Sequence, residues 1–351
     1  MSTQQRYVAP LDEMEWSVSS EAATTFKWEY ESAREPLLKL YRKGKRMQWD
    51  TDVRIDWSQD LDPENPQEMP DESVSIFGSD VWRRLTDTEK AQVRRHQQSW
   101  QLSQFLHGEQ GALVCTAKIV QQVPNVDAKY YAATQVMDEA RHVETYARLL
   151  HEKFELAYPI TPTLKRLLND ILSDSRWDMT YLGMQVLIEG LALAAFASIR
   201  DQAKNPLAAA VNAYVMQDEA RHVAFGRLAL RDYYPQLSDK ERDEREEFAV
   251  EACYLMRDRF LAEEVWENLG LPVEDCVRYV EASSDMRQFR SQLFMRIVPT
   301  IKDIGLWGPK IRRAYANMGI IGYGDIDSDE LMRNDERVAE EFDARSGRAL
   351  R

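Results

Sequence analysis

The residue types most capable of chemistry in this 351-residue sequence lie in a segment that occurs twice. Asp138–His142 reads Asp-Glu-Ala-Arg-His, and Asp218–His222 repeats the same five residues eighty positions later. Thirty residues before the glutamate of each copy stands another glutamate, Glu109 in the first half and Glu189 in the second. The recurrence indicates an internal duplication whose unit is a lone glutamate followed by a Glu-x-x-His pair.

A Glu-x-x-His pair places a carboxylate and an imidazole one helical turn apart on the same face. Glu139 can therefore share an ion with His142, and Glu219 with His222. With a second helix supplying the lone glutamate of each half, four helices bring four carboxylates and two imidazoles to one point, as in di-iron and di-manganese bundles. Oxygen and nitrogen ligands without thiolate favour iron or manganese over copper or structural zinc.

A single Glu-x-x-His pair on a helix is ordinarily a solvated surface feature and would indicate little. Glu189 argues for a metal instead. The segment 182–199 is small and apolar apart from Gln185, Glu189 and Ser198, and an unpaired carboxylate in such surroundings is costly. A bound metal is the simplest partner for it.

Over roughly residues 86–233 the sequence resembles the ferritin-like di-iron carboxylate superfamily. That superfamily includes bacterial multicomponent monooxygenases, the ribonucleotide reductase small subunit, acyl-carrier-protein desaturases and N-oxygenases. The resemblance implies a cofactor of two iron ions, with manganese as an alternative in one site. It further implies that some glutamates bridge the two ions, each of which is held mainly by one set: Glu109, Glu139 and His142, or Glu189, Glu219 and His222.

The resemblance also implies roles for the other charged residues of the repeat. Asp138 and Asp218 look like aspartates that orient the metal-bound histidines by hydrogen bonding. Arg141 and Arg221 look like the ion-pair partners of those aspartates. These four residues are expected to surround the metal ligands without touching the ions.

Tyr146 separates the branches of the superfamily. It lies one turn after His142, where the ribonucleotide reductase small subunit carries its radical tyrosine, and the duplicate position is Gly226. Against a radical role, Glu109 stands where that family typically has aspartate, and no tyrosine follows Tyr323 to relay a radical. A pocket wall or a hydrogen-bond donor to a metal ligand is the preferred interpretation, with a core tyrosine nearly as good.

Histidine positions bear on another branch. The p-aminobenzoate N-oxygenase type adds a third histidine ligand one turn before its second Glu-x-x-His, and residues 213–216 here contain none. Of the remaining histidines, His107 should point away from Glu109, while His96 and His151 are expected at the surface. A site of six ligands follows, and the N-oxygenase type becomes the less favoured branch.

Composition restricts partners and location. A formal charge of −14 argues against nucleic acid and anionic membranes as partners. Three cysteines far apart in the sequence indicate neither disulfides nor a cysteine metal site. With no signal segment and no uninterrupted apolar run of membrane-spanning length, a soluble cytoplasmic protein is expected.

Helix signals divide the chain into an N-terminal arm at 1–84, a four-helix core at 85–235 and a helical extension at 236–351, interpreted together as one domain. A capping box at Thr86 and Glu89 begins a helix that should run to about residue 122. Further core helices are predicted at about 126–156, 174–204 and 206–233, the last begun by Asn205 and Pro206. Two helical hairpins joined by a longer crossover form an all-α, ferritin-like plan.

Around this core the predictions are coarser. A short helix is expected within 20–34, and the proline- and aspartate-rich segment 49–70 should be an extended arm whose aspartates form turns. Helices are also expected at 163–172, 273–282 and 284–297, and a charged helix from Ser238 should cover the bundle and end near Gly270. The last thirty residues are highly charged and expected to be loose.

Three functions remain open from the sequence. The first is an oxygenase or oxidase that uses dioxygen to hydroxylate, N-oxygenate or desaturate a small organic substrate, with a separate ferredoxin or flavin reductase as electron donor. The second is a radical-generating subunit that uses Tyr146, and the third is a ferroxidase or other iron-handling protein. A homodimer is expected from the resemblance. Residues one turn from the glutamates should line the substrate pocket: Phe105, Ala112, Leu113, Ala192, Leu193 and Phe196.

Overall fold

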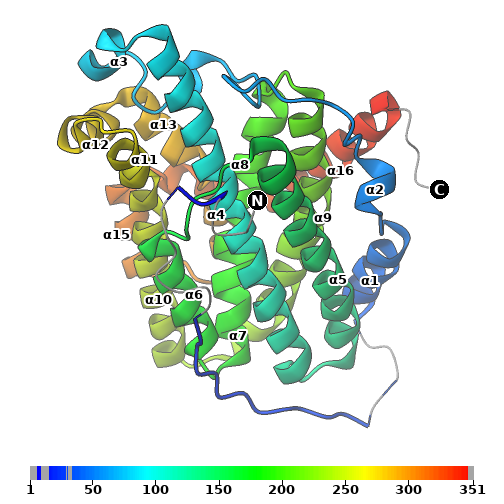
Figure 1. The fold of residues 1–351 in the computed structure, drawn as a ribbon. Coiled ribbons are helices and arrows are strands. Elements are labelled where there is room, and N and C mark those ends of the chain that lie inside the picture. The colour runs from blue at the N-terminus through cyan, green and yellow to red at the C-terminus, as the bar shows by residue number, and fades with distance from the viewer. Residues whose placement is uncertain (1–5, 9–15, 29, 31–33, 347–351) are drawn as a thin grey trace.

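A computed structural model describes residues 6–8, 16–28, 30 and 34–346, and within them all regular elements are helical (Figure 1). Four long helical segments form the core. In chain order they are α4 (Asp87–Gln122), α5 (Val126–Arg148) continued by η3 (Leu149–Phe154), α7 (Trp177–Thr180) continued by η4 (Tyr181–Ile188) and α8 (Glu189–Gln202), and α9 (Pro206–Tyr233). The predicted all-α bundle is confirmed.

Local capping chemistry explains where two of these helices begin. The Thr86 hydroxyl accepts a hydrogen bond from the Glu89 backbone, and the Glu89 carboxylate accepts one from the Thr86 backbone, so α4 starts with a complete capping box. Asn205 caps α9, whose first residue is Pro206. Both helices have the bounds that the sequence predicts.

The third core helix differs from its prediction as one regular helix over 174–204. It begins at Trp177, and η4 is a π-helix in which the Glu189 backbone N–H donates to the carbonyl of Met184, five residues back. A π-helical turn holds an extra residue and rotates the residues before it relative to those after it. The π-helix η3 similarly replaces the end of the predicted second helix. Hydrophobic periodicity does not reveal such insertions.

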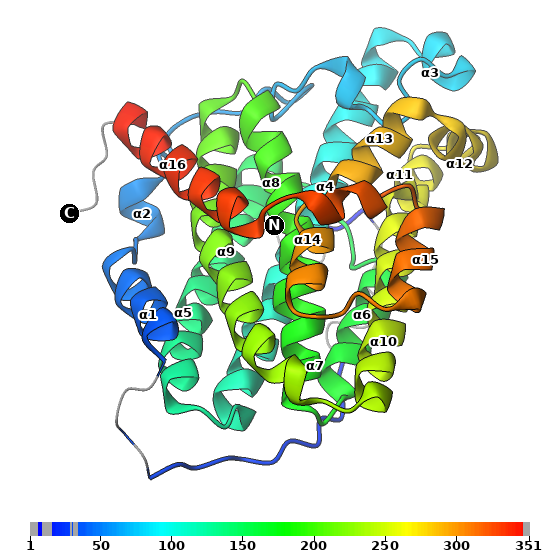
Figure 2. The same ribbon diagram turned by 180° about the vertical axis from the view of Figure 1, so that it is seen from behind.

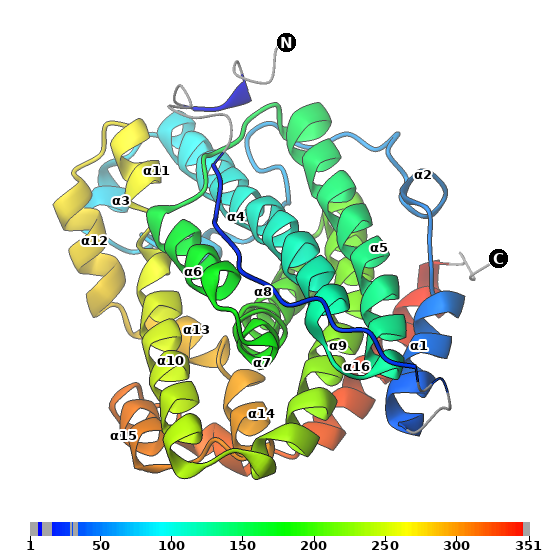
Figure 3. The ribbon, with the colours of Figure 1, turned by 90° about the horizontal axis from the view of Figure 1, so that it is seen from below.

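The helix pairs α4–α5 and α8–α9 lie side by side as two hairpins (Figure 1). Viewed from below, the α7–α8 segment lies at the centre, with α4, α6 (Pro162–Ser173), α9, α10 (Asp239–Asp258) and α14 (Ile297–Asp303) around it (Figure 3). By length and composition, 177–202 resembles a membrane span, but 78% of its apolar window is buried in the fold. Such burial is typical of the core helix of a bundle.

The N-terminal segment corrects one prediction. No helix forms in the described residues within 20–34, and the first helix is α1 (Glu35–Arg46), which packs on α5 and α9. The short elements α2 (Thr51–Arg54), η2 (Asp71–Ser73) and α3 (Asp80–Arg84) follow. Asp50 and Asp62 each accept a hydrogen bond from the backbone N–H two residues ahead, so the predicted turn role of these aspartates is confirmed.

After α9 the chain forms a layer of short helices over one side of the bundle (Figure 2). The predicted helix at 273–282 is confirmed, whereas the one at 284–297 ends early and the one from Ser238 breaks well before Gly270. Besides α10 and α14, the elements are η5 (Tyr234–Gln236), η6 (Arg259–Leu261), α11 (Glu263–Asn268), α12 (Val273–Ala282), α13 (Ser284–Gln292), α15 (Pro309–Asn317) and η7 (Ile321–Asp325).

The last helix, α16 (Ser328–Ser346), overturns the expectation of a loose tail up to residue 346, and residues 347–351 lie outside the described part. It lies across α9 and contacts α14 (Figure 2). Asp335 forms a buried ion pair with Arg296, and Asp329 pairs with the buried Arg227. Charge density alone indicated a solvated tail because the partners of these aspartates lie far away in the sequence.

Removing the carboxylate of Asp335 should loosen α16. The variant Asp335→Ala leaves the Arg296 guanidinium buried without its partner, which costs about 3–5 kcal/mol in comparable buried pairs. Glu336→Ala is the matched control, because Glu336 pairs with Lys43 at an exposed site and should cost less than about 1 kcal/mol. Urea unfolding and limited proteolysis of the C-terminal helix measure the difference, and equal losses in the two variants would contradict the assignment.

Candidate metal centre

The structure brings all six sequence-predicted ligands together inside the four-helix core. Glu109 extends from the middle of α4, and Glu189 is the first residue of α8. Glu139 and His142 lie on α5, and Glu219 and His222 on α9. All six are buried, with at most 5% of any one exposed.

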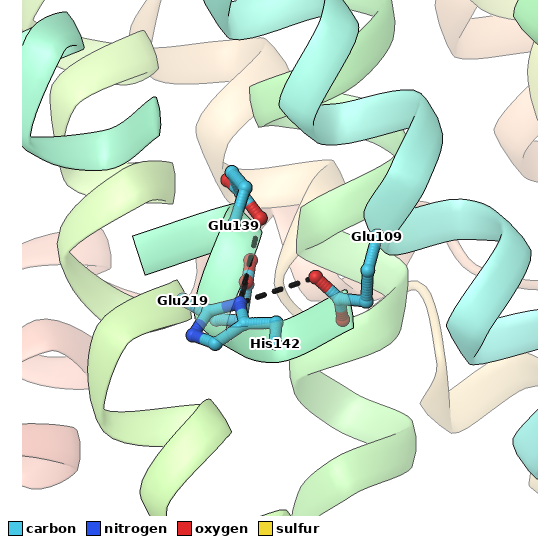
Figure 4. A group of neighbouring side chains, drawn as sticks. All are labelled: Glu109, Glu139, His142 and Glu219. Carbon is cyan, nitrogen blue, oxygen red and sulfur yellow. Dashed lines mark hydrogen bonds and ion pairs between the residues drawn. The ribbon is translucent and has the colours of Figure 1, made fainter. Parts of the chain in front are cut away.

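Candidate ligand atoms fall into two overlapping groups, each with its atoms within 4.8 Å of one another. One group joins Glu109, Glu139, His142 and Glu219, and Figure 4 shows the His142 imidazole facing the carboxylates of this group. The other joins Glu139, Glu189 and His222. Two adjacent cation sites that share carboxylates fit this pattern.

Both histidines present Nδ1 to the carboxylates. Nδ1 of His142 lies 3.2 Å from Glu109 Oε2 and 3.1 Å from Glu219 Oε1. Nδ1 of His222 lies 3.1 Å from Glu139 Oε1 and 3.3 Å from Glu219 Oε1. Glu139 and Glu219 thus lie between the two imidazoles, which makes them the candidates for bridging ligands.

The other imidazole nitrogen, Nε2, points outward to an aspartate of the opposite repeat. His142 Nε2 lies 3.1 Å from Asp218 Oδ2, and His222 Nε2 lies 3.3 Å from Asp138 Oδ2. This contact favours the tautomer that carries its proton on Nε2 and leaves the Nδ1 lone pair facing the centre. Through these contacts the two aspartates connect one hairpin with the other.

Arg141 and Arg221 neutralise these buried aspartates. Arg141 donates to Asp138 at 2.5 Å and to Asp218 at 2.9 Å, so it contacts both repeats. Arg221 pairs with Asp218 and lies 3.5 Å from Asp138. Two guanidinium groups and two carboxylates therefore form a closed, charge-balanced layer outside the histidines.

Two residues of the N-terminal arm join this layer, and sequence reasoning missed them. Gln48 donates to Asp138 Oδ1 at 2.7 Å, and Trp49 Nε1 donates to Asp218 Oδ2 at 2.8 Å. The guanidinium of Arg141 lies 4.7 Å from the centre of the Trp49 ring, a cation–π contact. No local pattern marks these two residues, because their partners are about ninety or more positions away.

Amide side chains hold another face of the centre. Gln135 Nε2 donates to Glu139 at 2.9 Å and to Glu189 at 3.1 Å, while Gln185 donates to the Gln135 carbonyl oxygen at 3.1 Å. Gln185 packs against Gly226, where an added Cβ would lie 2.7 Å from the Gln185 Cβ. The duplicate of the Tyr146 position therefore has to be glycine, because a glutamine occupies the space.

The donor set fits a pair of cations. Burial and the neighbouring Glu219 raise the pKa of Glu109 to about 8, and burial with the same neighbour raises the pKa of Glu189 well above its usual value. Oε2 of Glu139, Oε2 of Glu189 and both carboxylate oxygens of Glu219 have no hydrogen bond within the described structure. Buried acceptors without donors are costly, and two divalent cations would satisfy them.

A cavity of about 30 Å³ adjoins the centre between α4 and α8, and Glu109, Glu189 and Glu219 form part of its wall. Phe105, Ala112, Ala192 and Phe196 line it as predicted, whereas Leu113 and Leu193 do not. Tyr146 lies behind this wall, with its ring 5.8 Å from Phe105 and 6.0 Å from Phe196 between centroids. Its hydroxyl donates to Asn212 at 3.1 Å, and Asn212 is not a candidate metal ligand. The interpretation of Tyr146 as a hydrogen-bond donor to a metal ligand is therefore wrong.

The remaining histidines lie outside the centre. His107 contacts the Tyr158 backbone carbonyl at 2.9 Å and points away from Glu109, as expected. His96 contacts the Tyr158 hydroxyl at 2.9 Å and is only partly exposed, so its placement at the surface was too simple. Residues 213–216 of α9 offer no further histidine to the ions.

Comparison with known proteins gives one broad match. The family model described as "P-aminobenzoate N-oxygenase AurF" matches residues 30–305. No curated protein sequence matches the chain.

Similar solved structures are remote. A variant of an R2-like ligand-binding oxidase with a reconstituted Mn/Fe cofactor is 18% identical, with a TM-score of 0.49 over 78% of this chain and 95% of that one. A Synechococcus protein with aldehyde deformylating oxidase activity is 16% identical, with a TM-score of 0.46 over 64% of this chain and 96% of that one.

Metal stoichiometry tests the ligand assignment. Glu189→Ala removes a carboxylate on which one of the two groups depends, so binding should fall from two iron or manganese ions per chain to one or fewer. Glu144→Ala is the matched control, because Glu144 is an exposed glutamate on α5 and should leave the stoichiometry at two. Elemental analysis after anaerobic loading measures both, and two ions in the Glu189 variant would refute its role as a ligand.

The crossed aspartate–histidine contacts can be tested by a double-mutant cycle. Asp218→Asn should weaken metal affinity about 10–100-fold, because it loosens the orientation of His142. In a His142→Ala background the same change should weaken metal affinity little further. In a His222→Ala background it should weaken metal affinity by its full factor. Asp232→Asn, at an exposed position of the same helix, is the control. Equal effects in the two histidine backgrounds would show that the crossing has no role in metal binding.

Proposed function

The chain belongs to the p-aminobenzoate N-oxygenase AurF family, and from this premise we propose that it uses dioxygen to oxidise a small organic substrate beside its metal centre. Membership makes it a di-iron oxidoreductase of ferritin-like fold. The observation that carries the proposal is the position of the cavity. Three of the six candidate ligands form its wall, so a molecule in it would lie next to both ions.

The side chains of the chain itself prepare the centre for this reaction. Glu109, Glu139, Glu189 and Glu219 would supply four negative charges to two divalent cations, and the histidine Nδ1 atoms would complete the ligand set. Two ferrous ions bound there supply electrons for the reduction of dioxygen. Because the cavity wall facing the ions is otherwise mainly apolar, it excludes bulk water from the reacting groups.

The family name makes oxygenation of an amine nitrogen the first reaction to test. Against it stands the absence of a third histidine in 213–216, which leaves hydroxylation and desaturation as alternatives. The sequence has no nucleotide-binding glycine loop and no cysteine cluster, so a separate ferredoxin or flavin reductase is the proposed electron donor. We also propose that the protein is cytoplasmic and forms a homodimer.

The two other functions have less support. A radical role needs Tyr146 to exchange an electron with the centre, but its hydroxyl bonds to Asn212 and its ring packs against Phe105 and Phe196. Iron storage does not need the layer of α10–α16, which covers the bundle and is more useful for enclosing a substrate.

Stopped-flow absorption and Mössbauer spectroscopy of the iron-loaded, reduced protein with dioxygen test the function. We expect dioxygen to oxidise the centre and the resulting absorption to decay faster with one member of a substrate panel that includes arylamines. That compound should be converted into an oxidised product. Tyr146→Phe should keep at least about half of that rate and show no loss of a long-lived tyrosyl signal. An iron centre that oxidises once and is indifferent to every compound would refute the oxygenase, and a tyrosyl signal lost in Tyr146→Phe would establish the radical function instead.

A further inference from the structure

One residue of the cavity beside the metal centre has no role in the function proposed above. Arg259 lines this cavity together with Glu109, Glu189 and Glu219, and it is the one cationic side chain among the described residues of the wall. It comes from η6, where α10 breaks before α11 begins beside α4 (Figure 3). The rest of the lining is mainly apolar: Phe105, Ala112, Leu164, Met184, Ile188, Leu191, Ala192 and Phe196.

Arg259 is partly exposed, and it differs from most of the buried arginines in having no acidic partner among the described residues. Arg227, Arg245 and Arg296 each pair with an aspartate, as do the two arginines of the repeats. Within the described structure Arg259 has no hydrogen bond or ion pair, and its contact is with the ring of its neighbour Phe260, 5.3 Å away. Burial alone lowers its pKa to about 10, so it stays a cation at neutral pH.

The backbone around Arg259 is irregular in a way that bears on access. Phe260 has non-helical dihedral angles, and Ala262 has φ of 53°, a left-handed conformation that is unfavourable for a residue with a Cβ. Phe260 and Ala262 line a second cavity of about 160 Å³, which follows α4 and α8 outward from the first one. The turn 259–262 therefore forms a wall between the small cavity at the metals and a larger one.

The volumes of the two cavities limit where a ligand can bind. The small cavity of about 30 Å³ holds roughly a water molecule, whereas about 150 Å³ accommodates a benzene ring. A ring-sized molecule therefore fits in the larger cavity, and it reaches the metal ligands only where the two spaces join, with the turn 259–262 displaced. Such a molecule would have the guanidinium at one end of its site and the metal ligands at the other.

We propose that Arg259 binds the acidic group of the substrate, which is a small organic anion whose apolar body lies between this arginine and the metals. This inference rests on the proposed function. A guanidinium offers a carboxylate two parallel hydrogen bonds, and the bond gains strength where water is excluded. The four glutamates would neutralise two divalent cations, so the metal end offers an anion no surplus positive charge. The acidic group therefore goes to Arg259, and the oxidisable end of the molecule faces the ions. Arg259 is in this way a specificity-determining residue.

Binding selectivity tests the proposal without turnover. The probes are 4-aminobenzoate, benzoate and hexanoate, each compared with its neutral amide, and their affinities for the metal-loaded protein are measured anaerobically by calorimetry. Wild type should bind at least one acid about tenfold or more tightly than its amide. Arg259→Met should lose this preference, and Arg259→Lys should keep part of it, because the charge remains while the paired hydrogen bonds are lost.

Arg257→Met is the matched control, since Arg257 lies two residues earlier and pairs with Asp258 at a partly exposed site away from this cavity. It should keep the full preference of the wild type. Metal stoichiometry and thermal unfolding of each variant establish that the fold and the centre are intact. An Arg259→Met protein that keeps the preference, or a wild type that binds no acid more tightly than its amide, would overturn the proposal.

The outcomes also separate this inference from the proposed function. A protein that binds two ions and couples dioxygen to oxidation of a neutral compound, with no charge preference, refutes the role of Arg259 and leaves the oxygenase standing. A protein that loses the charge preference in Arg259→Met but never oxidises any compound supports the anion site and refutes the oxygenase. With a turned-over acid, Arg259→Met should raise KM more than it lowers kcat, since the contact is made in the ground state.

Discussion

The constraint on which the structure depends is the burial of four carboxylates at one point in the bundle. Removed from water, neighbouring carboxylates cannot all remain ionised: burial, together with repulsion from Glu219, raises the pKa values of Glu109 and Glu189. Two divalent cations provide the charge that the protein omits. The fold around the centre is therefore built for two metal ions: the histidines lie among the carboxylates, and carboxylate oxygens of Glu139, Glu189 and Glu219 have no hydrogen bond within the described structure.

Duplication solves the problem of holding these ligands rigidly. Each aspartate of the repeat bonds to the histidine of the other copy, and Arg141 pairs with both aspartates, so the two hairpins are joined by a charge-balanced layer. Gln48 and Trp49 close that layer from the N-terminal arm. Positioning of the ligands thus depends on contacts between halves, and local helix geometry sets only the spacing within each Glu-x-x-His pair.

How much the sequence could predict follows the range of the interactions. The starts of α4 and α9 were predictable because their caps lie within four residues, and the ligands because a five-residue repeat marks them. The partners of Trp49 and the docking of α16 were not, since each is set by a contact far away in the sequence. The π-helix η4 was not predictable either, because hydrophobic periodicity does not reveal an inserted residue. The charged residues of α16 were misjudged for the same reason. In the sequence Asp335 resembles a solvated residue of a loose tail, because its partner Arg296 lies far away in the chain.

The two halves of the duplication differ in the residues that surround the metal centre. On one side of the centre, Gln135 donates to Glu139 and Glu189, and Gln185 fills the space left by Gly226. Amide hydrogen bonds and the packing of Gln185 on Gly226 occupy this face. On the other side three glutamates border a mainly apolar cavity that reaches Arg259. A symmetric pair of repeats would present two equivalent faces, whereas here the described residues border a cavity on the side between α4 and α8.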